Sequence, residues 1–435
     1  MLIFGMGLTG ISCLHFFISR NIYPKIMDFN KNPKYIHNVQ CLKNIQYHVG
    51  SIYYPWIQES DLIITSPGIQ LFHPALIYAK KNKIEIIGDI ELFVRETKTP
   101  IIAITGSNGK STVTMMVRNI LQLAGFKVRV GGNIGIPALN ILNDPSELYI
   151  LELSSFQLET TLNLKAKVAT VLNISSDHMD RYPLGITEYV KHKLKIYNQA
   201  EVSILNLEDH LSFNAKIKKQ PNITFGIDKG EYNLCRKNRN VWLCYNKEKL
   251  LNVDKLLISG QHNYINALSA LSIVHILKVN IYTSLVALKE FLGLPHRFQL
   301  TYKKNNITWI NDSKSTNIGS TQSAINNILP YVKGKIRLIL GGDGKLANFS
   351  LLKPYLKDEK IIIYCYGRSK KILFSLYPKK SICFNTLENV IHFIKNIVKS
   401  GDVVLLSPSC SSLDQFSNFE ERGNTFVKLI EELYS

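Results

Sequence analysis

Short apolar runs alternate with helix-like patterns along almost the whole chain. Runs such as residues 2–4, 100–104 and 168–174 are followed by segments in which apolar residues recur every three or four positions. This alternation is typical of βαβ units, in which strands form a parallel sheet and helices cover its faces. The pattern predicts an α/β protein.

The runs fall into three blocks, which we expect to be domains at residues 1–88, 89–293 and 294–435. Residues 293–295, Gly-Leu-Pro, form a plausible hinge before the third block, and the polar stretch 210–255 gives no clear pattern. The other predicted strands are 61–65, 148–151, 308–310, 336–340, 361–366 and 403–406.

Residues 104–112 read ITGSNGKST and connect an apolar strand to a predicted helix at 113–121. They lack the first glycine of the full G-x-x-x-x-G-K-[ST] loop, because position 104 is isoleucine. A glycine-rich turn at a helix N-terminus still binds anions, since free N–H groups and the positive end of the helix dipole meet there. The loop therefore predicts a nucleotide phosphate site, with a surface turn as the alternative.

Two polar residues follow predicted strands of the same block. Glu152 comes directly after 148–151, and His178 follows 168–174. Open α/β sheets bind ligands beyond the carboxyl ends of their strands, so Glu152 is a candidate Mg²⁺ ligand and His178 a candidate site residue. Taken singly, each is also consistent with an ordinary loop residue in contact with solvent.

Lys193 lies on the apolar stripe of a predicted helix at 186–200. Tyr189, Lys193, Ile196 and Tyr197 have i, i+4, i+7, i+8 spacing. A buried ammonium group is costly unless it is paired or neutralised. Either the charged end reaches water along its packed stem, or a neutral amine is chemically modified.

The segment 5–10, GMGLTG, matches G-x-G-x-x-G, follows a short strand and precedes Asp28. Taken literally it predicts an NAD site with Asp28 on a ribose hydroxyl. Because the strand is short and a second nucleotide loop follows in the next block, another ligand that carries a diphosphate fits equally well.

The charge and the cysteines narrow the class of protein. The net charge is +19, but the excess lysines are scattered in pairs such as 80–81 and 303–304, without an arginine-rich stripe, so we expect no nucleic-acid partner. Seven cysteines without a C-x-x-C pair suggest neither a disulfide framework nor a zinc site. No apolar run approaches a membrane span, and the first residues lack the basic start of a signal peptide. We expect a cytoplasmic protein without a membrane partner.

Taken together, the ordered motifs resemble the Mur ligase family over nearly the whole chain. The motifs are GMGLTG (5–10), GDIELF (88–93), GSNGKST (106–112), GGNIG (131–135), LELSSFQLE (151–159), DHMDRYP (177–183), SGQHNYINA (259–267), GLPHRF (293–298), NDSKSTN (311–317), GGDGK (341–345) and SPSCSSLDQFSNFEERG (407–423). The family's ATP loop has the shorter G-x-x-G-K-[ST] form, which would explain the missing glycine.

The resemblance implies a Rossmann-like UDP-binding domain, a central P-loop-type ATPase domain with a parallel sheet and a Rossmann-like C-terminal domain. Within the family, the motifs are most similar to members that add D-glutamate to UDP-N-acetylmuramoyl-L-alanine with ATP through an acyl phosphate, in peptidoglycan precursor synthesis. It also implies closure of the third domain over the second, two Mg²⁺ sites, carbamylation of Lys193 by CO₂, and a monomer.

The resemblance assigns further residues. The implied catalytic residues are Lys110, Glu152, His178, Lys193 and Lys314. The implied metal ligands are Ser111, Glu152, His178 and Lys193 as its carbamate. The implied ATP residues are Gly106, Ser107, Asn108, Gly109, Lys110, Ser111, Thr112, Asn263, Asn266, Arg297 and Asp312. The implied residues for the UDP substrate are Leu8, Thr9, Asp28, Ser66, Gly68, Asn133 and His178, and those for D-glutamate are Thr316, Lys345, Ser412 and Phe419.

Two other classes explain only part of the chain. An NAD-dependent dehydrogenase would use residues 5–10 and leave 104–112, Lys193 and 311–317 without a role. A nucleic-acid-stimulated ATPase would use the charge and the phosphate loop but not the first block. The sequence departs from the family pattern in its short first strand and in Asn30, where a basic residue is expected, and both departures concern UDP binding.

Overall fold

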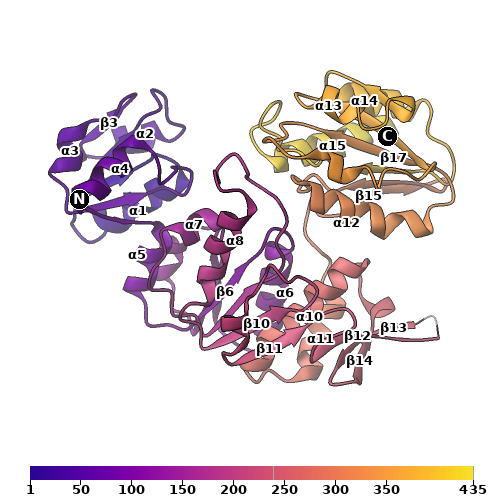
Figure 1. Cartoon of the computed structure of the whole chain (residues 1–435), viewed down its shortest axis with the longest axis horizontal. Helices are drawn as coiled ribbons and strands as arrows, with labels where there is room; N and C mark the ends of the chain where they lie inside the picture. The colour runs from indigo at the N-terminus through magenta and orange to yellow at the C-terminus, as the bar shows by residue number, and fades with distance from the viewer. Residues whose placement is uncertain (239, 435) are drawn as a thin grey trace. The chain divides into compact units, whose positions relative to one another are not determined.

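The computed structural model describes residues 1–238 and 240–434, and the chain forms two compact units (Figure 1). The first unit comprises Met1–Ile174, Thr187–Leu256 and Tyr264–Phe291, and contains two sheets. The second comprises Ser175–Ile186, Leu257–Asn263 and Leu292–Ser435, and contains the third sheet. This confirms the predicted α/β class, whereas the expected boundaries at 88 and 293 stay a prediction. None of the described helices is long and apolar enough to cross a membrane.

The first sheet has five parallel strands in the order β3-β2-β1-β4-β5. Its strands are β1 (Leu2–Phe4), β2 (Lys25–Asp28), β3 (Tyr47–Val49), β4 (Leu62–Thr65) and β5 (Glu85–Ile87). The helices of this region are α1 (Leu8–Ile18), α2 (Ile36–Gln40), α3 (Tyr54–Gln58), α4 (Pro74–Lys81) and α5 (Asp89–Glu96). The order reverses between β1 and β4, and such a switch point is where open α/β sheets bind ligands.

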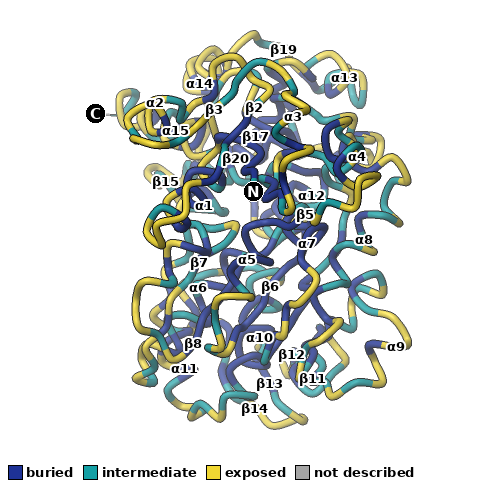
Figure 2. The backbone as a smooth tube through the Cα atoms, turned by 90° about the vertical axis from the view of Figure 1, so that its left-hand side faces the viewer, coloured by how far each residue is buried: buried dark blue, intermediate teal, exposed yellow. Residues whose placement is uncertain are grey.

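The second sheet has nine strands in the order β14-β13-β12-β11-β10-β9-β6-β8-β7. Its parallel strands are β6 (Ile101–Thr105), β7 (Val128–Gly132), β8 (Leu148–Glu152), β9 (Val168–Val171), β10 (Val202–Asn206), β11 (Asn222–Phe225) and β12 (Tyr232–Lys237). The helices of this region are α6 (Lys110–Leu123), α7 (Ser155–Glu159), α8 (Ile186–Leu194), α9 (Ala215–Lys218), α10 (Gln261–Ile276) and α11 (Ile281–Glu290). Figure 2 shows that β6 and β8 are buried along their length, whereas most of α9 is exposed.

An antiparallel extension accounts for much of the stretch that gave no clear pattern. Strand β12 pairs with β13 (Asn240–Tyr245), which pairs with β14 (Glu248–Asn252), both antiparallel. Cys235 and Cys244 lie on β12 and β13 and are linked as a disulfide, a single pairing that the sequence did not indicate. The separation of nine residues did not reveal the pairing, because it depends on this hairpin.

The third sheet has six strands in the order β15-β16-β20-β17-β18-β19, and only β15 is antiparallel to its neighbour. Its strands are β15 (Gln299–Lys304), β16 (Ile307–Asn311), β17 (Ile336–Gly341), β18 (Ile361–Tyr366), β19 (Ser381–Cys383) and β20 (Val403–Leu406). The helices of this region are α12 (Ile318–Ile328), α13 (Lys370–Phe374), α14 (Leu387–Lys395) and α15 (Phe419–Tyr434).

Helices cover both faces of the third sheet. Leu338 and Leu340 of β17 pack in one apolar cluster with Ile325 of α12, whereas Ile339 packs in another with Phe426 of α15. Successive side chains of a strand point to opposite faces, so this alternation places one core on each side of the sheet. The third sheet is therefore doubly wound, as the predicted Rossmann-like class requires.

A buried ion pair joins β17 to the start of β20. The Nη2 atom of Arg337 lies 2.7 Å from Oδ2 of Asp402, and the two side chains are 6% and 4% exposed. Asp402 Oδ1 also accepts from the Lys335 amide, and Arg337 donates to the Tyr364 hydroxyl and the Ile397 carbonyl. These bonds satisfy both charges, which is the condition for keeping an ion pair inside a protein.

Replacing Asp402 by alanine tests this pair. Asp402→Ala leaves a buried guanidinium without its counter-charge, so we expect the free energy of unfolding to fall by about 3–5 kcal/mol. The matched control is Asp144→Ala, which removes an ion pair to Arg129 at the surface and should cost about 1 kcal/mol or less. Urea unfolding followed by circular dichroism measures both. Equal costs for the two variants would contradict the structural importance of the buried pair.

Candidate functional site

The phosphate loop lies between the central strand β6 and helix α6. Gly106 and Gly109 have positive φ values of 152° and 84°. A Cβ at Gly109 would lie 2.6 Å from Oδ1 of Asn266, and one at Gly106 would lie 3.0 Å from Cβ of Leu172. The loop therefore needs both glycines, for backbone conformation and for space. Because the N-cap residue of α6 is Gly109, no side chain of that residue caps the first N–H groups of the helix. Uncapped N–H groups at a helix N-terminus suit an anion.

Two lysines donate to the same carbonyl of this loop. Lys110 Nζ lies 2.8 Å from the Gly106 oxygen and 3.1 Å from the Ser107 oxygen. Lys193 Nζ lies 2.9 Å from the Gly106 oxygen and 3.3 Å from the Thr105 hydroxyl. Two positive charges that share one acceptor repel each other, and a bound polyanion or a neutral amine lowers that cost.

The burial of Lys193 settles one of the two alternatives left open by the sequence. The buried residues of α8 are Tyr189 and Lys193, and Lys193 is 1% exposed. Its Nζ lies 4.8 Å from the centre of the Tyr189 ring, whose hydroxyl is 3.0 Å from the Ser107 hydroxyl. The position on the apolar stripe is thus confirmed, and the idea that the amine reaches water is wrong.

Glu152 ends strand β8, next to the strand that leads into the phosphate loop. Its side chain is 2% exposed, and Oε1 accepts a 2.9 Å hydrogen bond from Nδ2 of Asn133. Among the described residues, Oε2 has no hydrogen-bond partner. A buried carboxylate oxygen left open at this edge of the sheet fits a cation. The described residues contain no group of three His, Cys, Asp or Glu side chains that could hold a metal, so other oxygen ligands would have to complete such a site.

The loop after β9 carries His178, and residues 175–186 belong to the second compact unit. His178 has a φ of 56° and its Nε2 lies 3.7 Å from Oδ2 of Asp177. Asp177, which the sequence analysis did not single out, accepts from Asn317 at 3.1 Å and has Lys345 Nζ at 3.9 Å. Its place in the DHMD stretch beside His178 was the signal that could have identified it.

In the second unit, the candidate residues follow the carboxyl ends of three neighbouring strands. Asp312 and Lys314 follow β16, Ser412 follows β20 and Lys345 follows β17. The loops after β17 and β20 are tied by paired backbone bonds of 2.9 Å between Asp343 and Ser411. The strand order β16-β20-β17 thus gathers these candidates at one edge of the third sheet.

Asp312 has an unusual protonation equilibrium. Burial raises the pKa of its carboxyl to about 7, although hydrogen bonds from the Ser407 hydroxyl and the Phe298 amide and the nearby Arg297 act in the opposite direction. A perturbed carboxyl of this kind is a common property of ligand sites.

Two of the expected site residues, Lys314 and Phe419, are in direct contact. Lys314 Nζ lies 3.6 Å from the centre of the Phe419 ring, and the Phe419 carbonyl accepts from the Ser313 hydroxyl. Thr316 is half-buried and directly precedes Asn317, the N-cap of α12. Among the expected ATP residues, Asn266 lies against the phosphate loop. Asn263 belongs to the second unit, and its side-chain amide donates a hydrogen bond to the Ser259 carbonyl.

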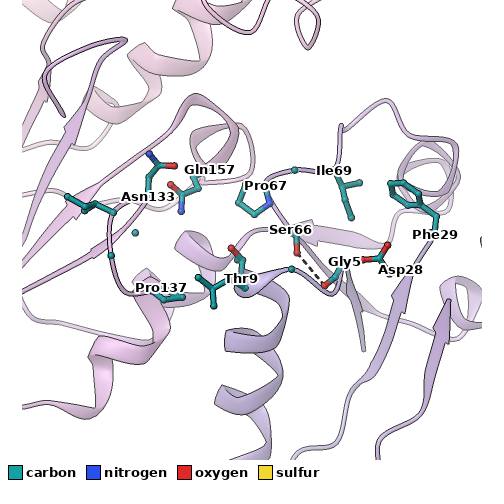
Figure 3. A pocket seen from close by; sticks show the side chains of 16 residues that line it. Gly5, Thr9, Asp28, Phe29, Ser66, Pro67, Ile69, Asn133, Pro137 and Gln157 are labelled. Atoms are coloured by element: carbon teal, nitrogen blue, oxygen red, sulfur yellow. Dashed lines mark hydrogen bonds between the residues drawn. The ribbon is translucent and has the colours of Figure 1, made fainter. Parts of the chain in front are cut away.

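A cavity of about 480 Å³ lies at the switch point of the first sheet and reaches the loop after β7 (Figure 3). It is lined by all the residues expected for the UDP substrate except His178: Leu8, Thr9, Asp28, Ser66, Gly68 and Asn133. The cavity is also lined by several residues that the sequence pattern did not indicate: Phe29, Pro67, Ile69, Ile134, Pro137 and Gln157.

The glycine loop at this cavity is held by Asp28. The two carboxylate oxygens of Asp28 accept from the Met6 amide at 2.7 Å and the Asn30 amide at 2.9 Å. A Cβ at Gly10 would lie 1.9 Å from the Gly5 carbonyl oxygen, so the loop packs directly on α1. Asp28 therefore fixes the loop, and because it also lines the cavity, its role as a ribose ligand stays a prediction.

Comparison with known proteins identifies the family. Family profiles match residues 1–88 (Mur ligase MurD-like, N-terminal domain), 104–274 (Mur ligase middle domain) and 296–410 (Mur ligase, glutamate ligase domain). UDP-N-acetylmuramoylalanine–D-glutamate ligases from Buchnera aphidicola subsp. Baizongia pistaciae and from Escherichia coli K12 are 61% and 47% identical over 433 residues, with 100% of this chain and 98% of each relative covered.

Solved structures agree with the fold. The UDP-N-acetylmuramate-alanine ligase MurC of Thermotoga maritima matches with a TM-score of 0.64 and 18% identity, over 99% of each chain. The MurF ligase of the same organism, solved in complex with ADP, matches with a TM-score of 0.65 and 18% identity, over 99% of this chain and 95% of that one. The chain therefore belongs to the Mur ligases, a family of ATP-dependent amide ligases of peptidoglycan precursor synthesis.

Proposed function

We propose that this protein joins D-glutamate to UDP-N-acetylmuramoyl-L-alanine, using ATP, as a monomer in the cytoplasm. The observation that carries the proposal is the pair of sites within the first unit: a phosphate loop at 106–112 and a separate cavity built on a second glycine loop at 5–10. One site suits ATP and the other a second nucleotide. Relatives named for this reaction, similar over the whole chain, supply the substrate names.

The reaction starts from a carboxylate, which is a poor electrophile. In the proposed first step, a carboxylate oxygen of the substrate attacks the γ-phosphorus of ATP and ADP leaves, which gives an acyl phosphate. The amine of D-glutamate then attacks the acyl carbon, inorganic phosphate leaves, and the amine releases a proton. Lys110 and the backbone amides at the start of α6 hold the transferring phosphates and offset their negative charge. We assign the same charge-neutralising role to Lys314 of the second unit.

Mg²⁺ would neutralise the phosphate charges when bound. We assign one ion to Glu152 and Ser111, because Glu152 is buried with an open Oε2 and Ser111 lies in the first turn of α6. We assign a second ion to His178 and to Lys193 in its carbamate form. The neutral amine of Lys193 would attack CO₂, form an N–C bond and release one proton, which converts the buried amine into an anionic oxygen ligand.

The remaining assignments follow the two sheets. For the base and ribose of ATP we propose Asn263, Asn266, Arg297 and Asp312, of which Asn266 contacts the phosphate loop. For D-glutamate we propose Thr316, Lys345, Ser412 and the backbone of Phe419, which follow β16, β17 and β20. Lys345 supplies a positive charge that suits a carboxylate of the amino acid.

The substrate requirement is the direct test of this function. Phosphate release from ATP and Mg²⁺ should require both UDP-N-acetylmuramoyl-L-alanine and D-glutamate, because the acyl phosphate turns over only when the amine attacks it. A coupled phosphate assay compares D-glutamate, L-glutamate and no amino acid. Release that is indifferent to the nucleotide precursor or to D-glutamate would overturn the proposal.

The role of Lys193 has a separate test with a control on the same helix. Lys193→Ala should lower the rate by about 100-fold or more, because an anionic ligand is lost from a site where charge develops. Bicarbonate should not restore it, whereas short-chain carboxylates should restore part of it. Lys191→Ala removes an exposed lysine of α8 and should leave the rate unchanged. A fully active Lys193→Ala enzyme would refute the carbamate.

A further inference from the structure

Phe29 places an exposed aromatic ring on the wall of the cavity in the first unit. It directly follows Asp28, the last residue of β2, so it lies at the carboxyl edge of the sheet. Its side chain lines the cavity beside Asp28 and Ile69 (Figure 3), and the residue is 46% exposed. An apolar ring held open at a ligand cavity offers a surface for a flat, apolar part of a ligand.

Two other aromatic side chains pack against the Phe29 ring and hold it in place. The His73 ring stacks on it, with centroids 5.0 Å apart and an interplanar angle of 22°. The buried Phe4 meets both rings edge to face, at 6.1 Å from Phe29 and 5.4 Å from His73. His73 does not line the cavity. The His73 ring therefore covers one side of the Phe29 ring, and the rest of the Phe29 ring faces the cavity.

A backbone hydrogen bond holds the His73 ring in place. Its Nδ1 accepts a 3.3 Å hydrogen bond from the Ala75 amide and so caps helix α4. Burial lowers the pKa of the imidazole below its usual value, in agreement with an acceptor nitrogen that carries no proton. The three rings form a rigid platform that needs no ordering when a ligand arrives, and this limits the entropic cost of binding.

The other parts of the cavity suit a phosphate and a polar group. The glycine loop leads into α1, whose first residues follow Gly7 without a side-chain cap. Asn133 and Gln157 line the end away from Phe29 (Figure 3). The Asp28 carboxylate already accepts hydrogen bonds from two backbone amides, which limits the hydrogen bonds that it can make to a ligand near Phe29. Stacking of the ligand on the Phe29 ring therefore gains in importance.

We propose that Phe29, backed by His73 and Phe4, is the stacking platform for the pyrimidine ring of the nucleotide substrate. The inference rests on the proposed function, because it places the base of a uridine nucleotide at this end of the cavity. Phe29 acts here as a residue that determines affinity and specificity for the substrate and takes no part in the chemical steps.

Binding of two probes that differ in the base tests the platform. Isothermal titration calorimetry with UDP and with inorganic pyrophosphate compares the wild type, Phe29→Ala and Phe29→Tyr. Loss of a base stacked on an aromatic side chain should weaken UDP binding roughly tenfold in Phe29→Ala and leave pyrophosphate binding unchanged. Phe29→Tyr keeps the ring and should bind UDP like the wild type.

Phe72→Ala is the matched control. Phe72 is 48% exposed and belongs to the same sheet region, but it does not line the cavity, so UDP binding should not change. In the complete reaction, Phe29→Ala should raise the KM for the nucleotide substrate about as much as it weakens UDP binding and leave kcat unchanged, because the platform acts on binding alone.

The outcomes separate this inference from the proposed function. If the wild type binds UDP and Phe29→Ala binds it equally well, the platform is wrong and the proposed function stands. If Phe29→Ala loses UDP and pyrophosphate in equal measure, Phe29 shapes the glycine loop instead, and the platform is again wrong. If the wild type binds no UDP, the proposed function itself fails.

Discussion

The carbonyl oxygen of Gly106 accepts hydrogen bonds from two lysines, Lys110 and Lys193, and the arrangement of positive charge around the phosphate loop depends on this contact. Gly106 can expose that oxygen because its φ of 152° is open to glycine and strained for other residues. Lys110 starts α6 and Lys193 comes from α8, so two helices place positive charge on one short loop. A polyphosphate is the ligand that such a loop stabilises most, and an uncharged or modified Lys193 lowers the repulsion when it is empty.

In each of the three sheets, candidate site residues lie at the carboxyl ends of parallel strands. Gly5 and Ser66 follow two adjacent strands of the first sheet, and Glu152 ends a strand beside the one that precedes the phosphate loop in the second. Because parallel strands end at the same edge, short loops with little in common in sequence are brought together there. This explains how a chain with scattered motifs forms compact sites within each unit.

Much of this arrangement could be predicted from the sequence, for identifiable reasons. Strands β1, β18 and β20 coincide with predicted runs, because strands buried on both faces are continuously apolar. The burial of Lys193 followed from helical spacing. Strands β12 to β14 were not predicted, because β12 is exposed toward its end and carries no continuous apolar run. The contacts of Asp177 with Asn317 and Lys345, and the stack of Phe29 on His73, depend on tertiary structure that local pattern does not encode.

Transfer of oxygen from the carboxylate to phosphate tests the central claim that the substrate is activated as an acyl phosphate. UDP-N-acetylmuramoyl-L-alanine labelled with ¹⁸O in its carboxylate would be turned over with ATP and D-glutamate, and the released phosphate would be analysed by mass spectrometry. The account predicts one ¹⁸O atom in each phosphate when both carboxylate oxygens are labelled, because the bridging oxygen leaves with phosphorus. Phosphate without label would show that the carboxylate never bonds to phosphorus and would contradict the mechanism.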